Sequence, residues 1–159
     1  MMKKMCFGVM IAVLLASVPA VAQVSDTDLL QQLRADIQTD RQALVTANLG
    51  LTDAEGEVFW PIYRQYRAEM GAVGDRMQKL ILDYAEVWET PTDEQAGAMI
   101  DEFLAIRKQE LKVRKSYLKK FRKVLPEVKV ARFVQIENKI EAIINFGLAD
   151  VIPLIEAGD

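Results

Sequence analysis

The chain has no histidine, and Cys6 is its single cysteine. Histidine is the most frequent general base in enzymes and the most frequent side-chain ligand of transition metals, so its absence removes the commonest catalytic and metal-binding arrangements. A serine or threonine nucleophile would have no histidine to activate it. The sequence therefore predicts a protein that is not an enzyme and that holds neither a cofactor nor a metal ion.

The cysteine lies in an N-terminal segment with the pattern of a secretory signal peptide. Two lysines give this segment a basic start, residues 5–16 form a short apolar run, and small residues ending at Ala22 supply a cleavage site. The apolar run is short for a membrane span, although a retained membrane anchor is the alternative. We expect cleavage after Ala22, which separates residues 1–22 from a single helical domain, residues 23–159, in the periplasm. That domain has no cysteine and forms no disulfide.

Charge is segregated along this domain. Residues 23–106 contain 6 basic and 16 acidic side chains, residues 107–139 contain 12 basic and 3 acidic ones, and residues 140–159 contain 4 acidic ones alone. A basic run of this kind is most often a solvated helix face. Export and the acidic total argue against a nucleic-acid partner. Peripheral contact of a basic amphipathic helix with anionic membrane headgroups stays open.

The stretch from Leu51 to Trp88 carries the clearest helical pattern. Its apolar residues recur at alternating spacings of four and three, as in the seam of a coiled coil. They are Phe59, Tyr63, Tyr66, Met70, Val73, Met77, Leu80, Tyr84 and Val87. The pattern predicts one long helix, which Pro61 kinks, and an aromatic cluster at its beginning that belongs to a core or an interface.

Helix-start signals divide the rest of the chain. Thr52 with Glu55 and Thr92 with Gln95 have the spacing of capping boxes, and Pro126 suits the first turn of a helix. The predicted helices span residues 26–45, 53–89, 93–124 and 127–146, and a C-terminal tail follows. Short connections make the two long helices antiparallel neighbours. The predicted fold is all-α, an elongated antiparallel hairpin of about four helices whose flat shape offers no pocket for an enzyme.

Two arginines interrupt the apolar face of the predicted helix 93–124. Arg107 and Arg114 either pair with acids of the preceding helix, such as Glu69 or Asp83, or stay on an exposed concave surface. In the second case the surface suits weak binding of unfolded chains, with charge attracting the client and apolar groups holding it. The residues assigned to this surface are Arg107, Arg114, Lys115, Tyr117 and Phe121.

A pair of acids on the last predicted helix is the remaining candidate for chemistry. Glu137 and Glu141 lie one helical turn apart. They lack the Glu-x-x-His partner of a di-iron site, and a hydrolase that used them would need a pocket. We expect both side chains to face solvent.

Two predicted helices begin with Leu51-Thr52-x-x-Glu55 and Leu125-Pro126, in a chain that is expected to be exported, helical and cysteine-poor. In these features the sequence resembles the Spy/CpxP-like periplasmic family, which is named for a repeated L-T-x-x-Q motif. Glu55 replaces the motif glutamine, and the second copy keeps only the leucine. The resemblance implies a curved, cradle-like homodimer that acts as an ATP-independent chaperone for unfolded or stressed envelope proteins. The alternative is a non-enzymatic envelope-stress sensor that binds one protein partner or the membrane surface.

Overall fold

The computed structural model describes residues 40–156, all of which belong to one compact unit, Ile37–Asp159. Within this part of the chain, residues 40–49 are helical and three longer helices follow, with no strand among them. The helices are α2 (Asp53–Ala85), α3 (Asp93–Phe121) and α4 (Glu127–Val151). The predicted all-α class is confirmed for these residues. The signal peptide and most of the predicted helix 26–45 lie outside them.

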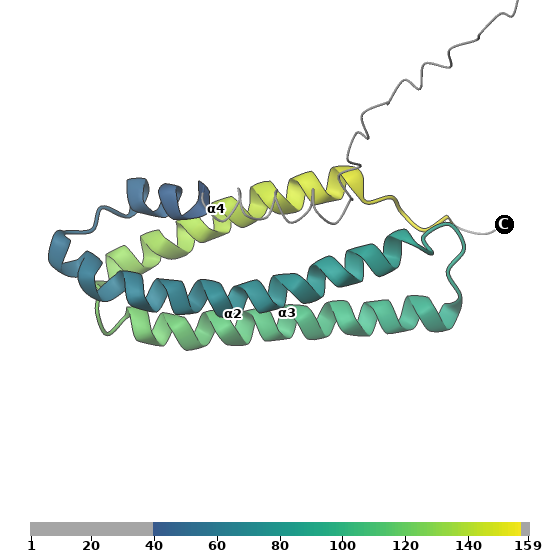
Figure 1. Ribbon diagram of the computed structural model, residues 1–159, viewed down its shortest axis with the longest axis horizontal. Helices are drawn as coiled ribbons and strands as arrows, with labels where there is room; N and C mark the ends of the chain where they lie inside the picture. The colour runs from purple at the N-terminus through teal and green to yellow at the C-terminus, as the bar shows by residue number, and fades with distance from the viewer. Residues whose placement is uncertain (1–39, 157–159) are drawn as a thin grey trace, which may run out of the picture. The chain divides into compact units, whose positions relative to one another are not determined.

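The first two long helices form an antiparallel hairpin in which α2 and α3 lie side by side (Figure 1). Both begin with the predicted capping boxes. The Thr52 amide donates to Glu55 Oε2 at 2.8 Å and the Glu55 amide donates to Thr52 Oγ1 at 3.3 Å. The same exchange between Thr92 and Gln95 has distances of 2.9 and 3.2 Å. Each box satisfies amides that the first helical turn leaves free.

Four predicted helix ends moved, each for a local reason. The helical segment 40–49 continues past residue 45 and ends where Gly50 takes a φ of +64°, a conformation that favours glycine. α2 stops four residues early, because the amides of Val87 and Thr90 turn to i−3 carbonyls. α3 ends at Phe121, three residues before position 124, because the amides of Lys123 and Val124 turn to i−3 carbonyls. α4 runs five residues past position 146 and through Gly147, since apolar residues on both sides of the glycine pack on one face. α2 also continues through Pro61 without ending there.

The core is an aromatic cluster where α2 begins, α3 ends and α4 begins. Phe121 of α3 lies 4.8 Å from Phe133 of α4 between ring centroids, and Phe59 of α2 lies 5.2 and 5.7 Å from these two rings. Buried side chains of the segment 40–49, Val45 and Leu49, complete this core. The aromatic cluster expected from the start of the long helix is therefore a core. From this end α4 inclines away from the hairpin (Figure 1).

The two motif-like helix starts meet at this same end. Leu51 packs against the core and Leu125 is buried within it, while Pro126 caps α4 from an exposed position. Glu55 forms an ion pair with Lys129 of the second start, 74 residues further along the chain. The two starts are thus joined by a salt bridge between their first turns.

The ion pair with Lys129 makes the carboxyl group of Glu55 unusually acidic. The Lys129 ammonium, helped by the Thr52 amide, lowers the pKa of Glu55 from 4.5 to about 2. Because the folded pKa lies below the unfolded one, ionised Glu55 stabilises the fold above pH 4.5, and this contribution is lost as the pH falls toward 2. We expect carboxyl ¹³C titration to place the Glu55 pKa near 2 in the wild type and closer to 4.5 in Lys129→Met. Lys115→Met is the control, and a wild-type value near 4.5 would contradict the ion pair.

Candidate functional site: an apolar cavity with a charged end

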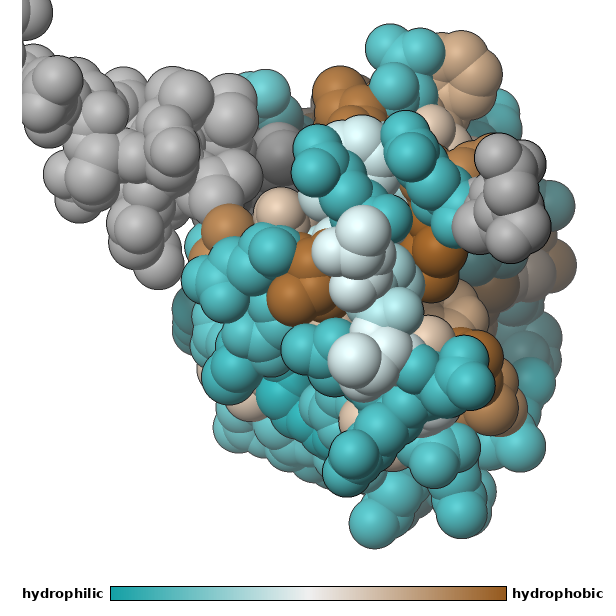
Figure 2. All heavy atoms as spheres, turned by 90° about the vertical axis from the view of Figure 1, so that its right-hand side faces the viewer, coloured by the Kyte–Doolittle hydropathy of each residue, from teal (hydrophilic) through white to brown (hydrophobic). Residues whose placement is uncertain are grey.

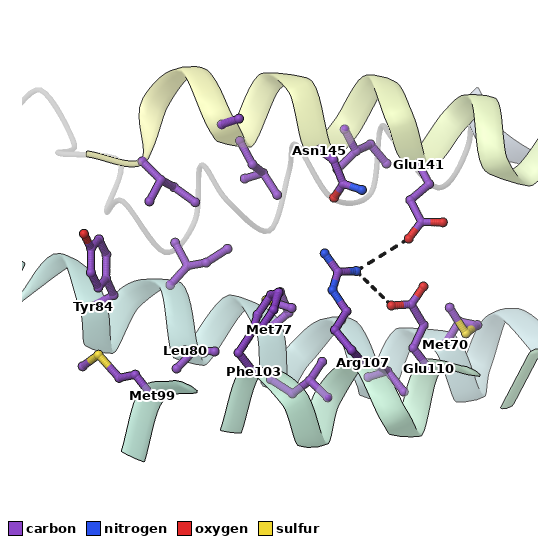
Figure 3. A pocket seen from close by; sticks show the side chains of 18 of the residues that line it. Met70, Met77, Leu80, Tyr84, Met99, Phe103, Arg107, Glu110, Glu141 and Asn145 are labelled. Atoms are coloured by element: carbon purple, nitrogen blue, oxygen red, sulfur yellow. Dashed lines mark hydrogen bonds and ion pairs between the residues drawn. The ribbon is translucent and has the colours of Figure 1, made fainter. Parts of the chain in front are cut away.

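A cavity of about 760 Å³ lies between the α2–α3 hairpin and α4 (Figure 3). Its walls are mostly apolar. They include Met70, Val73, Met77, Leu80 and Tyr84 from α2, Met99, Phe103 and Ile106 from α3, and Ile144 and Leu148 from α4. The expectation that a flat hairpin would have no pocket was wrong, because α4 does not lie flat along the hairpin.

The sequence creates this space with small residues and an inclined helix. Gly74, Ala96 and Ala149 line the cavity, so each of the three helices has a short side chain or none at one point of the wall. The apolar seam of α2 continues from the aromatic core into the cavity, where α3 covers one side of it and α4 stands away. Seen from the end where the α2–α3 turn lies, hydrophobic side chains show between hydrophilic ones (Figure 2).

The C-terminal tail closes one end of the cavity. The Tyr84 hydroxyl donates a hydrogen bond of 2.7 Å to the Pro153 carbonyl oxygen, 69 residues away in sequence. Ile152 and Ile155, on either side of this contact, line the cavity. The tail is therefore fastened to α2 and covers the end of the cavity where Tyr84 lies.

Arginine and glutamate side chains form the opposite end. Arg107 Nη1 lies 3.0 Å from Glu110 Oε2 and 3.7 Å from Glu141 Oε1, and Figure 3 shows its guanidinium reaching from α3 toward α4. Arg114 donates to Glu110 at 2.7 Å and also to Glu141. Burial, together with the neighbouring Glu110 carboxyl, raises the pKa of Glu141. Asn145 adds an amide beside these charges.

Glu137 is a buried acid, which corrects the expectation that it faces solvent. Only 2% of this residue is exposed. Its Oε2 atom lies 2.8 Å from Arg41 Nη1 and 3.7 Å from Arg67 Nη1, and it accepts a hydrogen bond of 3.4 Å from the Tyr66 hydroxyl. Glu141, with 26% of its side chain exposed, is also engaged in ion pairs. The signal that sequence analysis missed is the position of Glu137, four residues after Phe133 and three before Ile140 on the apolar seam of α4.

The residues assigned to one client-binding surface lie in three places. Arg107 and Arg114 are at the charged end of the cavity, and their partners are Glu110 and Glu141, whereas the suggested partners Glu69 and Asp83 bind other groups. Lys115 is exposed on α3. Tyr117 and Phe121 are 2% and 1% exposed, so both are core residues and their assignment to a surface was wrong. They follow the apolar seam that α3 turns toward α2 and α4.

Lys115 lies on a different surface, which we call the α3 outer face. It consists of the exposed residues Leu104, Lys108, Leu111 and Lys115. At about 100° per residue their side chains fall within one narrow sector of the helix. Leu104 is 58% exposed and Leu111 is 52% exposed, so two large apolar side chains lie between lysines and in contact with solvent.

Comparison of the chain with protein-family models, with curated proteins and with solved structures finds no match. Among residues 40–156, no helix combines the length and the apolar character that a bilayer crossing requires. The resemblance to the Spy/CpxP-like family stays a prediction from the sequence. What the described residues define is an all-α protein with an amphipathic cavity and a separate cationic and apolar helix face.

Proposed function

We propose that this protein is an ATP-independent chaperone of the periplasm that binds unfolded or partly folded envelope proteins through the α3 outer face. The observation that carries the proposal is the exposure of Leu104 and Leu111 between Lys108 and Lys115. About half of each leucine is left in contact with solvent. A client segment with apolar and acidic residues complements this face, because lysines attract the acids and leucines bury the apolar groups.

The small apolar area of the α3 outer face explains why release of a client would need no ATP. Complete burial of a leucine side chain contributes about 1.5–3 kcal/mol, and two leucines that are already half-buried contribute less than twice that. Exposed lysine contacts add at most about 1 kcal/mol each and weaken with salt. Binding of this strength is weak and reversible, so a client that folds and hides its apolar segment leaves the surface.

The proposal predicts protection of unrelated clients. Two denatured proteins of different sequence are diluted into buffer with and without the purified protein, at low and high salt, and aggregation is followed by light scattering. We expect protection of both clients. We expect Leu104→Ser with Leu111→Ser to remove most of the protection at either salt concentration, and Lys108→Glu with Lys115→Glu to remove the salt-sensitive part. No protection at several-fold molar excess would contradict the proposal.

The control removes exposed apolar groups elsewhere. Val58 on α2 and Val128 on α4 are 45% and 82% exposed, and neither lies on the α3 outer face. Val58→Ser with Val128→Ser should leave protection unchanged. An equal loss with this control variant would show that general surface hydrophobicity matters and would overturn the assignment to α3. A single tight protein partner without client protection would instead favour the envelope-stress sensor, the alternative function.

The curved homodimer and peripheral contact with the membrane also stay proposals. Ile143 and Phe146 of α4 are 72% and 78% exposed, and such large apolar groups on one helix suit an interface. They lie on α4, so a dimer that buries them leaves Leu104 and Leu111 of α3 for clients. Dimerisation and client binding therefore use different helices in this proposal.

A further inference from the structure

We infer that the cavity between the α2–α3 hairpin and α4 is a binding site for a long-chain carboxylate, with its acyl chain along the apolar walls and its carboxylate at the arginine end. This inference does not depend on the chaperone proposal, which rests on a different face of α3 whose residues do not line the cavity. It rests on two observations: the form of the apolar walls and the charge balance of the arginine end.

The walls suit a flexible apolar chain. A volume of about 760 Å³ falls within the range of about 300–1,000 Å³ that is typical of ligand sites. Along α2 the wall runs from Met70 to Tyr84, roughly 21 Å at 1.5 Å per residue, which is long enough to hold an extended acyl chain lengthwise. Met77 and Met99 contribute unbranched side chains that adapt to a ligand without a fixed shape.

The arginine end has an excess of positive charge. Arginines at positions 41, 67, 107 and 114 line the cavity, and among residues 40–156 the acids that pair with them are Glu110, Glu137 and Glu141. Arg67 is the least well paired of the four, because Glu137 Oε2 lies 3.7 Å from it but only 2.8 Å from Arg41. A partly buried excess cation is stabilised by a further anion. A monoanionic carboxylate would balance the charge.

Among the described residues, two buried guanidinium atoms have no acceptor, and the Tyr63 hydroxyl and Glu137 Oε1 also have no hydrogen-bond partner. Arg41 is 8% exposed, and its Nε atom has no hydrogen-bond partner among the described residues. The same holds for Arg114 Nε. Both residues line the cavity. A buried donor without an acceptor is costly, and a carboxylate is the group that accepts most strongly from guanidinium donors. Both Nε atoms are inaccessible to solvent, so they do not themselves face the cavity, and the argument for an anion rests on the charge balance.

The apolar end of the cavity suits an acyl chain better than a polypeptide. The tail, fastened by the Tyr84–Pro153 hydrogen bond, and the side chain of Ile155 cover this end with apolar atoms. A peptide inserted this far would bury amide groups without partners, whereas an acyl chain has none. An amphiphile with one anionic group therefore fits both ends of the cavity.

Binding of soluble amphiphiles tests the inference directly. Delipidated protein is titrated by calorimetry with dodecanoate, dodecyltrimethylammonium and dodecyl maltoside, each below its micelle concentration. We expect dodecanoate to bind with one-to-one stoichiometry and roughly ten times more tightly than the other two, the effect of one charged hydrogen-bond partner. Absence of dodecanoate binding, or equal affinity for the cationic amphiphile, would overturn the inference.

Matched variants locate the ligand. Arg67→Gln should weaken dodecanoate binding roughly tenfold, while Arg64→Gln, one turn away and outside the cavity lining, should not. Ala96→Trp fills the apolar end and should abolish binding, whereas Ala98→Trp, on the exposed side of α3, should bind normally. Circular dichroism verifies the fold of each variant. Binding of an acidic amphipathic peptide that Ala96→Trp blocks, without dodecanoate binding, would assign the cavity to a polypeptide and overturn the inference.

Discussion

Replacing Phe59 by alanine is expected to lower the free energy of unfolding by about 3–5 kcal/mol, the cost of removing a large aromatic side chain from a packed core. Phe59 is 0% exposed. Its ring centroid lies 5.1–5.7 Å from four neighbouring rings, including Phe121 of α3 and Phe133 of α4. Loss of this ring leaves a void between three helices. Urea unfolding followed by circular dichroism at 222 nm measures the change.

The residue before Phe59 supplies the control. Val58 is 45% exposed on the same turn of α2, so Val58→Ala changes the same helix without opening the core. We expect this variant to stay within about 0.5 kcal/mol of the wild type. Equal losses for the two variants would contradict the described core. Phe59→Leu, which keeps most of the apolar volume, should fall between them.

Replacing Glu137 by alanine is expected to cost about 3–5 kcal/mol, because it leaves Arg41 buried without its partner. Arg67 loses its nearby anion in the same change. The helix propensity of alanine favours the variant slightly, so the loss comes from the charges and not from α4 itself. The same urea measurement reports it. A loss below about 0.5 kcal/mol, the size of an ordinary surface substitution, would mean that Glu137 is not buried in solution.

A double variant separates the charge effect from the packing effect. Glu137→Leu combined with Arg41→Met replaces the buried ion pair by apolar groups of similar size, which is often neutral or stabilising. We expect the double variant to be more stable than either Glu137→Leu or Arg41→Met alone. If the two single losses simply add in the double variant, the two side chains do not interact as described.

Local sequence signals predicted the helices well. The alternating four and three spacing of apolar residues identified α2, and hydroxyl and carboxyl or amide pairs identified the beginnings of α2 and α3. Thr52 and Thr92 act within four residues of the chain, so their effect can be read from sequence alone. The aromatic core was also visible, because Phe59, Tyr63 and Tyr66 repeat on one side of the helix.

The cavity could not be predicted in this way. Its existence depends on the inclination of α4, which is set by contacts such as Phe121 with Phe133 and by the absence of large side chains at Gly74 and Ala149. These residues are far apart in sequence, and no periodicity reports their distance in space. For the same reason the sequence left open whether Arg107 and Arg114 pair with acids of α2 or stay exposed, and it did not indicate Glu110 and Glu141 as their partners. The burial of Glu137 is the one feature of the site that the sequence could have indicated, since its spacing from Phe133 places an acid on the apolar seam of α4.

The uneven distribution of aromatic residues has a consequence for hydrogen exchange. Backbone amides near Phe59, Phe121 and Phe133 lie in the densely packed part of the fold, so we expect them to exchange only through global unfolding. At the far end of α4 the contacts are fewer, since Val151 and Leu154 are 70% and 88% exposed and the Tyr84 hydroxyl holds the tail. This end can therefore open by a local fluctuation while the aromatic end stays intact, which gives an apolar molecule a way into the protein that does not pass through the unfolded state.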